Sequence, residues 1–189
     1  MNNKKFIAAV AAGALALGCT IGGTVAWLTA KTDTITNTFT TSDITVTLTE
    51  TKENFQMIPG WTIDKDPTVA VDPASEDCYV FVKVEESANF DEYMTYTVDS
   101  GWTQLKNGET PVNGVFYREV VIADGATAAS LTYPVLAGNK VTVLGTVDKE
   151  DMAAAKTSAP TLTFTAYASQ LYKDNTNKFD AYTAWINIA

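Results

Sequence analysis

The stretch Ile44-Thr45-Val46-Thr47-Leu48-Thr49 indicates the fold class, because apolar and polar residues alternate along it without a break. Successive side chains of a β-strand point to opposite faces, so Ile44, Val46 and Leu48 share one face and three threonines share the other. This pattern is typical of a strand with one buried face. Similar runs predict further strands at residues 79–84, 93–98, 115–122, 131–136, 141–147 and 162–167.

Turn-forming residues separate these runs. Asp99-Ser100-Gly101 stands between strands expected at residues 93–98 and 102–106, which predicts a tight hairpin. Other turns are predicted at Pro59-Gly60, Asp72-Pro73, Lys106-Asn107-Gly108, Asp124-Gly125 and Ala137-Gly138-Asn139. Short strands joined by turns favour an all-β fold, a jelly-roll-like antiparallel β-sandwich.

One or two short helices are expected beside the strands. Asp148 is a suitable N-cap for a helix over residues 149–156, with acidic residues in its first turn and a lysine at its end. Pro160 ends this segment. A second helix is predicted over residues 180–186, where its apolar side chains can cover one end of the sheets.

The N-terminus has the three parts of a secretory signal peptide. A basic start with Lys4 and Lys5 precedes an apolar run over residues 6–17, and small residues follow up to Ala26. Signal peptidase is therefore expected to cut between Ala26 and Trp27. Residues 1–26 are predicted to be the signal peptide, and residues 27–189 to form a single β-sandwich domain that is secreted and keeps no membrane contact.

Two alternatives to cleavage remain open. The apolar stretch over residues 6–28 is long enough for a membrane anchor, but two glycines interrupt it and no basic cluster follows. Cys19 follows a glycine, as in a lipoprotein signal, but the leucine that such a signal carries is displaced by one position.

Charge and cysteine content bound the class of protein. The whole chain has 13 basic and 22 acidic residues, and removal of Lys4 and Lys5 leaves a net charge of −11. Such a surface disfavours nucleic acid and anionic membranes as partners. Without Cys19, Cys78 has no partner for a disulfide, and its apolar surroundings predict a buried small side chain.

Little in the sequence points to catalysis. The chain has no histidine, which removes the commonest general base and the usual zinc ligand. No phosphate loop, dinucleotide fingerprint or nucleophile elbow is present. We therefore predict that the protein is not an enzyme and has no catalytic residues.

Two binding hypotheses remain, each beside a simpler interpretation. Five acidic residues are a weak candidate for a calcium site: Asp64, Asp66, Asp72, Glu76 and Asp77. The interpretation that these residues lie in solvated acidic loops is favoured. Trp61 and Trp102 are candidates for stacking on a sugar. Aromatic residues beside turns more often seal the end of a sandwich, and this interpretation is preferred for both. No cofactor is predicted otherwise.

Several segments together resemble the TasA/camelysin family. They are Gly22-Gly23-Thr24-Val25-Ala26-Trp27-Leu28-Thr29, Asn37-Thr38-Phe39-Thr40-Thr41-Ser42-Asp43-Ile44-Thr45-Val46, the Pro59-Gly60 loop from Met57 to Val69, the run Cys78-Tyr79-Val80-Phe81-Val82-Lys83-Val84, and more loosely Tyr133-Pro134-Val135-Leu136 and Phe164-Thr165-Ala166-Tyr167-Ala168-Ser169-Gln170. The resemblance implies a signal peptide of the SipW-dependent type. It also implies a secreted jelly-roll protein of the cell surface or biofilm matrix in Gram-positive bacteria, associating with itself or with related matrix proteins.

In fibre-forming members of that family, the freed N-terminal segment of one subunit adds as a strand to the next. Here residues 27–41 are threonine-rich, with Leu28, Ile35 and Phe39 as apolar anchors. An exposed sheet edge can accept such a segment through backbone hydrogen bonds. The alternative is that residues 27–41 form an edge strand of their own domain.

Two other functions are weighed against assembly. One is a monomeric extracellular module that binds a carbohydrate or a host ligand. The other is a metalloprotease, since camelysin itself is described as one; the absence of every histidine makes it the less favoured hypothesis.

Overall fold

The central strand of the protein is β4 (Cys78–Glu86), which is buried on both faces. In the computed structural model, which describes residues 43–51 and 55–189, Val80 and Val82 point to one side of β4 and Tyr79 and Phe81 to the other. A strand buried on both sides has no need of polar residues, which explains the unbroken apolar run. Its sheet is antiparallel in the order β10-β4-β7-β6, with β10 at Leu162–Gln170, β7 at Thr110–Val120 and β6 at Thr103–Asn107.

The second layer is made of two three-stranded antiparallel sheets that continue one another. One has the order β1-β3-β8, with β1 at Val46–Thr49, β3 at Thr68–Val71 and β8 at Thr132–Pro134; the other has the order β2-β9-β5, with β2 at Thr62–Asp64, β9 at Leu136–Val143 and β5 at Met94–Val98. Only Val135 separates β8 from β9, and its amide donates to the carbonyl of Pro67 at 2.9 Å. The amide of Lys65 donates to the carbonyl of Asn139, also at 2.9 Å, so pairing runs on from one sheet to the other.

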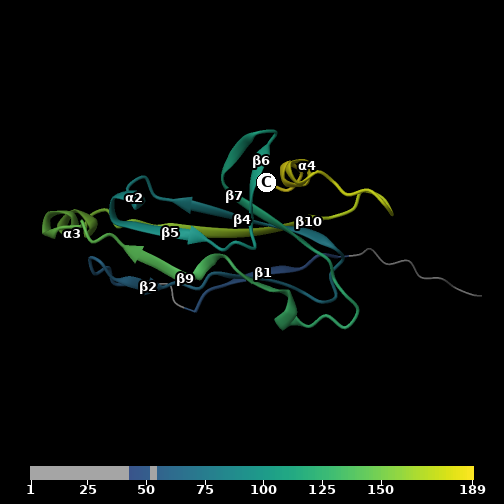
Figure 1. Ribbon diagram of the computed structural model, residues 1–189, viewed down its shortest axis with the longest axis horizontal. Coiled ribbons are helices and arrows are strands. Elements are labelled where there is room, and N and C mark those ends of the chain that lie inside the picture. Colours follow the sequence, from purple (N-terminus) through teal and green to yellow (C-terminus); the bar gives the residue numbers. More distant parts are fainter. Residues whose placement is uncertain (1–42, 52–54) are drawn as a thin grey trace, which may run out of the picture. The chain divides into compact units, whose positions relative to one another are not determined.

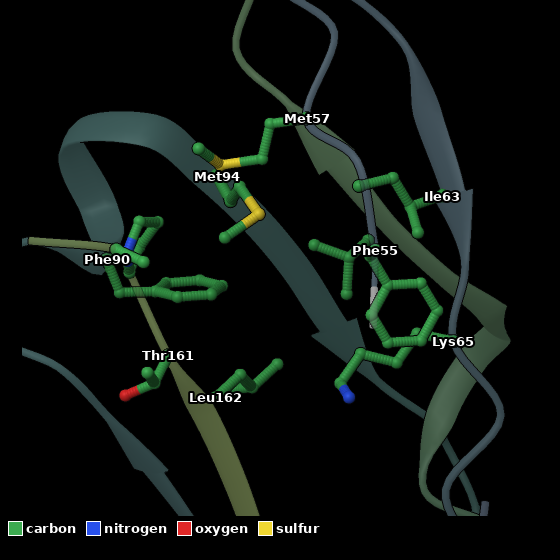
Figure 2. Close-up of a pocket in the computed structure, with 11 residues that line it drawn as sticks. Phe55, Met57, Ile63, Lys65, Phe90, Met94, Thr161 and Leu162 are labelled. Atoms are coloured by element: carbon green, nitrogen blue, oxygen red, sulfur yellow. The ribbon is translucent and has the colours of Figure 1, made fainter. Parts of the chain in front are cut away.

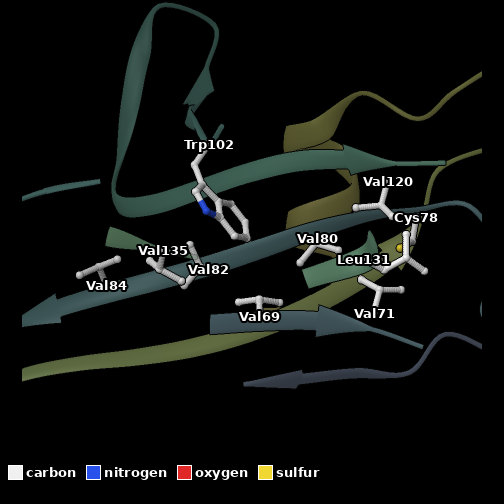
Figure 3. Close-up of a cluster of buried hydrophobic side chains, with 10 residues drawn as sticks. All are labelled: Val69, Val71, Cys78, Val80, Val82, Val84, Trp102, Val120, Leu131 and Val135. Carbon is white, nitrogen blue, oxygen red and sulfur yellow. The ribbon is translucent and has the colours of Figure 1, made fainter. Parts of the chain in front are cut away.

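These layers confirm the predicted all-β sandwich (Figure 1). The chain changes layer at the connections β3–β4, β4–β5, β5–β6, β7–β8 and β9–β10. Valines dominate the interior: Val69 and Val71 of β3 face Val80 and Val82 of β4, and the indole of Trp102 lies between the layers (Figure 3). A core of this kind stabilises the domain without a disulfide, through apolar surface removed from water.

Within residues 43–51 and 55–189, three helices and one 3₁₀ turn accompany the strands; their bounds are α2 Phe90–Tyr93, η1 Ala128–Leu131, α3 Lys149–Ala155 and α4 Ala181–Ile186. The predicted helix after Asp148 is confirmed as α3, since the Asp148 carboxylate accepts from the amide of Asp151 and the Asp151 side chain returns a bond to Asp148. The second predicted helix is confirmed as α4. Its residues Ala184 and Trp185 pack on Phe81, on the outer face of the β4 sheet.

The predicted hairpin at Asp99-Ser100-Gly101 is wrong, although the turn is present. The amide of Trp102 donates to the carbonyl of Asp99 at 3.0 Å, but β5 and β6 belong to different layers. Trp102 immediately follows the turn, and burial of its indole in the core carries the chain across the sandwich. The tight hairpin is instead β6–β7, where Gly108 has a φ of +58°.

Some strand boundaries also differ from the predictions. Strand β9 begins at Leu136, so Gly138 and Asn139 do not end a strand; their φ angles of +61° and +56° bend it instead. Strands β2 and β3 and helix α2 were not predicted. Each is too short to set up a visible periodicity.

The described residues belong to one compact unit. The predicted signal peptide, its cleavage site between Ala26 and Trp27, Cys19 and the segment 27–41 all lie outside the described residues. Among the residues that are described, no helix is long and apolar enough to cross a membrane.

Candidate functional site

The outer edge of β10 is the longest unprotected strand edge in the described part of the chain. Its nine residues pair in unbroken register with β4, and no described strand pairs with its other side. The strand contains no charged residue, proline or glycine. Proteins usually protect such edges with lysine, proline or a bulge, because an open edge is a template for pairing with another chain.

The other edge strands are shorter, and two of them are less regular. Strand β1 has four residues, and β5 and β6 have five residues each. The register of both β5 and β6 shifts against the neighbouring strand, and β6 contains Lys106. Strand β10 therefore provides the long, regular and uncharged edge.

An apolar seam runs along this edge, where β1 of one layer faces β10 of the other. Its half-buried side chains are Val46 and Leu48 from β1, Ile44 just before β1, and Leu162, Phe164 and Ala166 from β10. A hollow of about 490 Å³ lies at one end of the seam, between Asp43 and Gln170, and another of about 480 Å³ lies at the other end, between Thr49 and Leu162. The two strands therefore run in opposite directions along a side of the sandwich that is not closed.

A cavity of about 370 Å³ opens beside the Leu162 end of the seam (Figure 2). It lies between the layers, because Met94 comes from β5 and Leu162 from β10. Figure 2 shows side chains of both layers arranged around an open centre, among them Phe55, Met57, Ile63, Phe90, Met94 and Leu162. Val141 adds to the apolar lining. The loop over residues 159–161 forms the remaining wall.

Among the described residues, Lys65 is the one charged residue that lines this cavity. Its ammonium donates to both carboxylate oxygens of Glu50, at 2.8 and 3.0 Å, and the two side chains are 12% and 20% exposed. The same ammonium lies 4.9 Å from the ring centre of Phe55 and 5.3 Å from that of Phe164. Its charge is thus balanced by a carboxylate and by the negative faces of two rings, which leaves a wall suited to an aromatic side chain.

The two tryptophans that sequence reasoning singled out have opposite environments. Trp102 is 6% exposed, and its indole donates to the carbonyl of Pro134 at 2.8 Å, so its predicted role in packing is confirmed and it presents no face to a sugar. Trp61 is 63% exposed, so the prediction that it seals the sandwich is wrong. Its amide bonds to the carbonyl of Ile58 across the Pro59-Gly60 turn, and this tight turn projects the indole outward.

The acidic residues proposed for calcium are not brought together. Asp64 pairs with Lys140, and Asp66 accepts from Thr51. Asp72 accepts from the amide of Ala74, while Asp77 accepts from the amide of Ile122. The described residues contain no group of three or more acidic, cysteine or histidine side chains placed to hold a metal ion. The Asp72 carboxylate orders its own turn, whereas the other three bond to residues distant in the sequence.

Cys78 is a buried thiol, as predicted. Burial raises the pKa of Cys78 to about 11, and the neighbouring charge of Asp77 adds to the increase. A thiol with this pKa is protonated at neutral pH and is a poor nucleophile.

Sequence reasoning identified a strand at residues 162–167 but neither its open edge nor the Lys65–Glu50 pair. The open edge had one available signal, the nine uncharged residues from Leu162 to Gln170. The ion pair had none, since its partners are 15 positions apart and meet only through the pairing of β1 with β3. No protein-family model matches the chain, and comparison with the curated proteins and with the solved structures found no match either.

Proposed function

We propose that the protein is a secreted structural component of the cell surface or biofilm matrix, which polymerises when the N-terminal segment of one copy adds as a strand to the next. The observation that carries this proposal is the open, uncharged edge of β10. The resemblance to the TasA/camelysin family points in the same direction.

Strand addition suits this edge for two physical reasons. Each backbone hydrogen bond to β10 contributes a net stabilisation of about 1 kcal/mol. An added strand also covers the apolar seam, and removal of that surface from water adds to the affinity. Because the same contact leaves each new copy with an open edge, the assembly does not close and grows into a filament.

The negative charge of the protein favours contact through the uncharged β10 edge and makes assembly depend on ionic strength. With a net charge of −11 after cleavage, two copies repel each other over most of their surface, and β10 has no charge of its own. Added salt screens this repulsion, so assembly becomes stronger as ionic strength rises.

Cleavage between Ala26 and Trp27 by signal peptidase frees the segment that adds to the edge.

Electron microscopy and sedimentation of protein that begins at Trp27 test the proposal. We expect filaments from this form, and monomers when residues 27–41 are deleted. Lysine at the edge provides a finer test: Thr163→Lys with Thr165→Lys is expected to abolish assembly, whereas Thr103→Lys on β6, at the opposite end of the same sheet, is expected to leave it intact. Monomers from the unmodified protein, or filaments from the deletion variant, would contradict the proposal.

A second candidate function rests on Trp61. This residue is 63% exposed and its neighbour in the turn, Ile58, is 39% exposed, so the Pro59-Gly60 loop presents an apolar tip to solvent. Such a surface suits a carbohydrate or a host protein as ligand. A glycan array with wild-type protein and Trp61→Ala tests it; no signal, or the same signal from both proteins, removes this candidate.

The metalloprotease remains the least favoured hypothesis, because the chain supplies no histidine to hold zinc. Casein digestion that a chelator stops, together with zinc in the purified protein, would revive it.

A further inference from the structure

The cavity and the start of the described chain lie at opposite ends of the same edge. Asp43 is beside Ser169 and Gln170, at the end of β10. The cavity adjoins Leu162, at the beginning of β10. Nine strand residues place these two ends about 26 Å apart.

This separation limits which residues can fill the cavity from within one copy. Phe39 is four residues before Asp43, so a fully extended chain carries it at most about 14 Å from that point. Phe39 therefore cannot reach the cavity of its own copy. Only residues at about position 35 or earlier can do so.

A second copy removes the restriction. When two copies follow one another in the same orientation, the Asp43 end of the first meets the cavity end of the second. The three residues between Phe39 and Asp43 then need to span only the junction between the copies, which is within the reach of an extended chain.

We propose, as a refinement that rests on the proposed function, that Phe39 of one copy occupies the apolar cavity of the next and that the preceding residues run antiparallel to β10. Phe39 then lies at the Leu162 end of β10 of the next copy. The residues that precede Phe39, back to Trp27, lie progressively closer to Gln170. The direction of the segment from Trp27 to Phe39 is therefore opposite to that of β10. Antiparallel pairing matches every other strand pair in the described sheets.

The spacing of the apolar anchors fits this placement. Ile35 and Phe39 are four residues apart, so they share one face of a strand, while Leu28 points to the other. With Phe39 at Leu162, Ile35 stands opposite Ala166, whose side chain faces the apolar seam. Both anchors then cover half-buried apolar surface.

The chemistry of the cavity also favours an aromatic residue. Its volume of about 370 Å³ is within the range of ligand pockets and accepts a phenyl ring. Met57 and Met94 provide sulfur–aromatic contacts, and the Lys65 ammonium, already beside two rings, lies in the same wall.

Substitution of the anchors gives the first test, with filament formation measured as a function of protein concentration. Phe39→Ala is expected to raise the concentration needed for assembly at least about tenfold, the effect of one lost aromatic contact, and Phe39→Leu to raise it less. Leu28→Ala is the matched control and is expected to have the smaller effect of the two alanine variants. Filaments formed by Phe39→Ala at the wild-type concentration overturn this inference and leave the proposed function intact.

Cysteine cross-linking gives the second test and reads the direction of the strand. Thr38→Cys with Thr163→Cys is expected to form disulfides between copies, giving a ladder on a non-reducing gel. Thr38→Cys with Ser169→Cys is the matched control and is expected to remain uncross-linked; Cys78 is buried and does not compete. Cross-links within a single chain show that the segment pairs with its own copy and overturn the inference. Cross-links between copies only in the Ser169 variant show parallel pairing and also overturn it. Absence of any filament overturns both proposals.

Discussion

The indole of Trp102 donates a hydrogen bond to the carbonyl oxygen of Pro134 at 2.8 Å and so ties the β5–β6 turn to β8. The guanidinium of Arg118, on β7, lies 3.9 Å from the ring centre of Tyr133 and 5.4 Å from that of Trp102. Aromatic and cationic side chains from β7, from β8 and from the β5–β6 turn thus hold the two layers together at the point where the chain crosses between them. Along β10 the Lys65 ammonium makes a contact of the same kind with Phe164, 5.3 Å from its ring centre, and a hollow lies at each end of the seam.

Replacement of Trp102 by phenylalanine should lower the free energy of unfolding by about 2 kcal/mol, because the smaller ring leaves a void and the carbonyl of Pro134 loses its partner. Urea denaturation followed by circular dichroism measures the change. Trp61→Phe is the control: Trp61 is 63% exposed, so a change within about 0.5 kcal/mol is expected. Equal effects of the two substitutions would falsify the assignment of Trp102 to the core.

Gly114→Ala should destabilise the domain by at least about 3 kcal/mol. Gly114 has a φ of +66°, and a Cβ atom there would lie 2.2 Å from the carbonyl oxygen of Val84, so the backbones of β4 and β7 would have to separate. Gly108 has nearly the same φ, +58°, but open space around it. Gly108→Ala should therefore cost only the backbone strain, about 1 kcal/mol. Thermal unfolding of both variants separates the contact from the strain, and a Gly114→Ala variant no less stable than Gly108→Ala contradicts this explanation.

Glu50→Gln should destabilise the protein by about 1–2 kcal/mol, because it leaves the largely buried Lys65 ammonium without its carboxylate. The double variant Lys65→Met, Glu50→Gln should recover most of this loss, since neither partner then carries a charge. A double-mutant cycle in urea measures the coupling. Additive effects of the two substitutions would show that the pair contributes nothing beyond its separate side chains.

The thiol of Cys78 should resist iodoacetamide in the folded protein at pH 8 and react promptly in urea. With its pKa raised to about 11, about one thiol in a thousand is ionised at that pH. The raised pKa also makes folding depend on pH: the contribution of the neutral thiol is complete below the unfolded value of about 9 and is lost as pH rises toward 11. The stability difference between wild type and Cys78→Ala should shrink over that interval. Rapid native alkylation at pH 8 argues against burial.

Local chemistry in the sequence determined most of the described elements of this protein, though not the short β2, β3 and α2. Alternation along Ile44–Thr49 predicts a strand because side-chain direction in a strand depends only on position along the chain. Capping by Asp148 predicts helix α3 because the cap bonds close within three residues. The continuous apolar run from Cys78 to Val82 likewise predicts a strand buried on both faces.

The tertiary structure alone decided which strands pair and which edge stays open. The turn at Asp99 was visible in the sequence, but burial of Trp102 between the layers, not the turn itself, separates β5 from β6. Lys65 meets Glu50, and the cavity opens beside Leu162, only because strands distant in sequence stack in two layers. Local patterns encode hydrogen-bonding and side-chain direction over a few residues, whereas pairing and burial depend on competition among all the apolar faces of the chain.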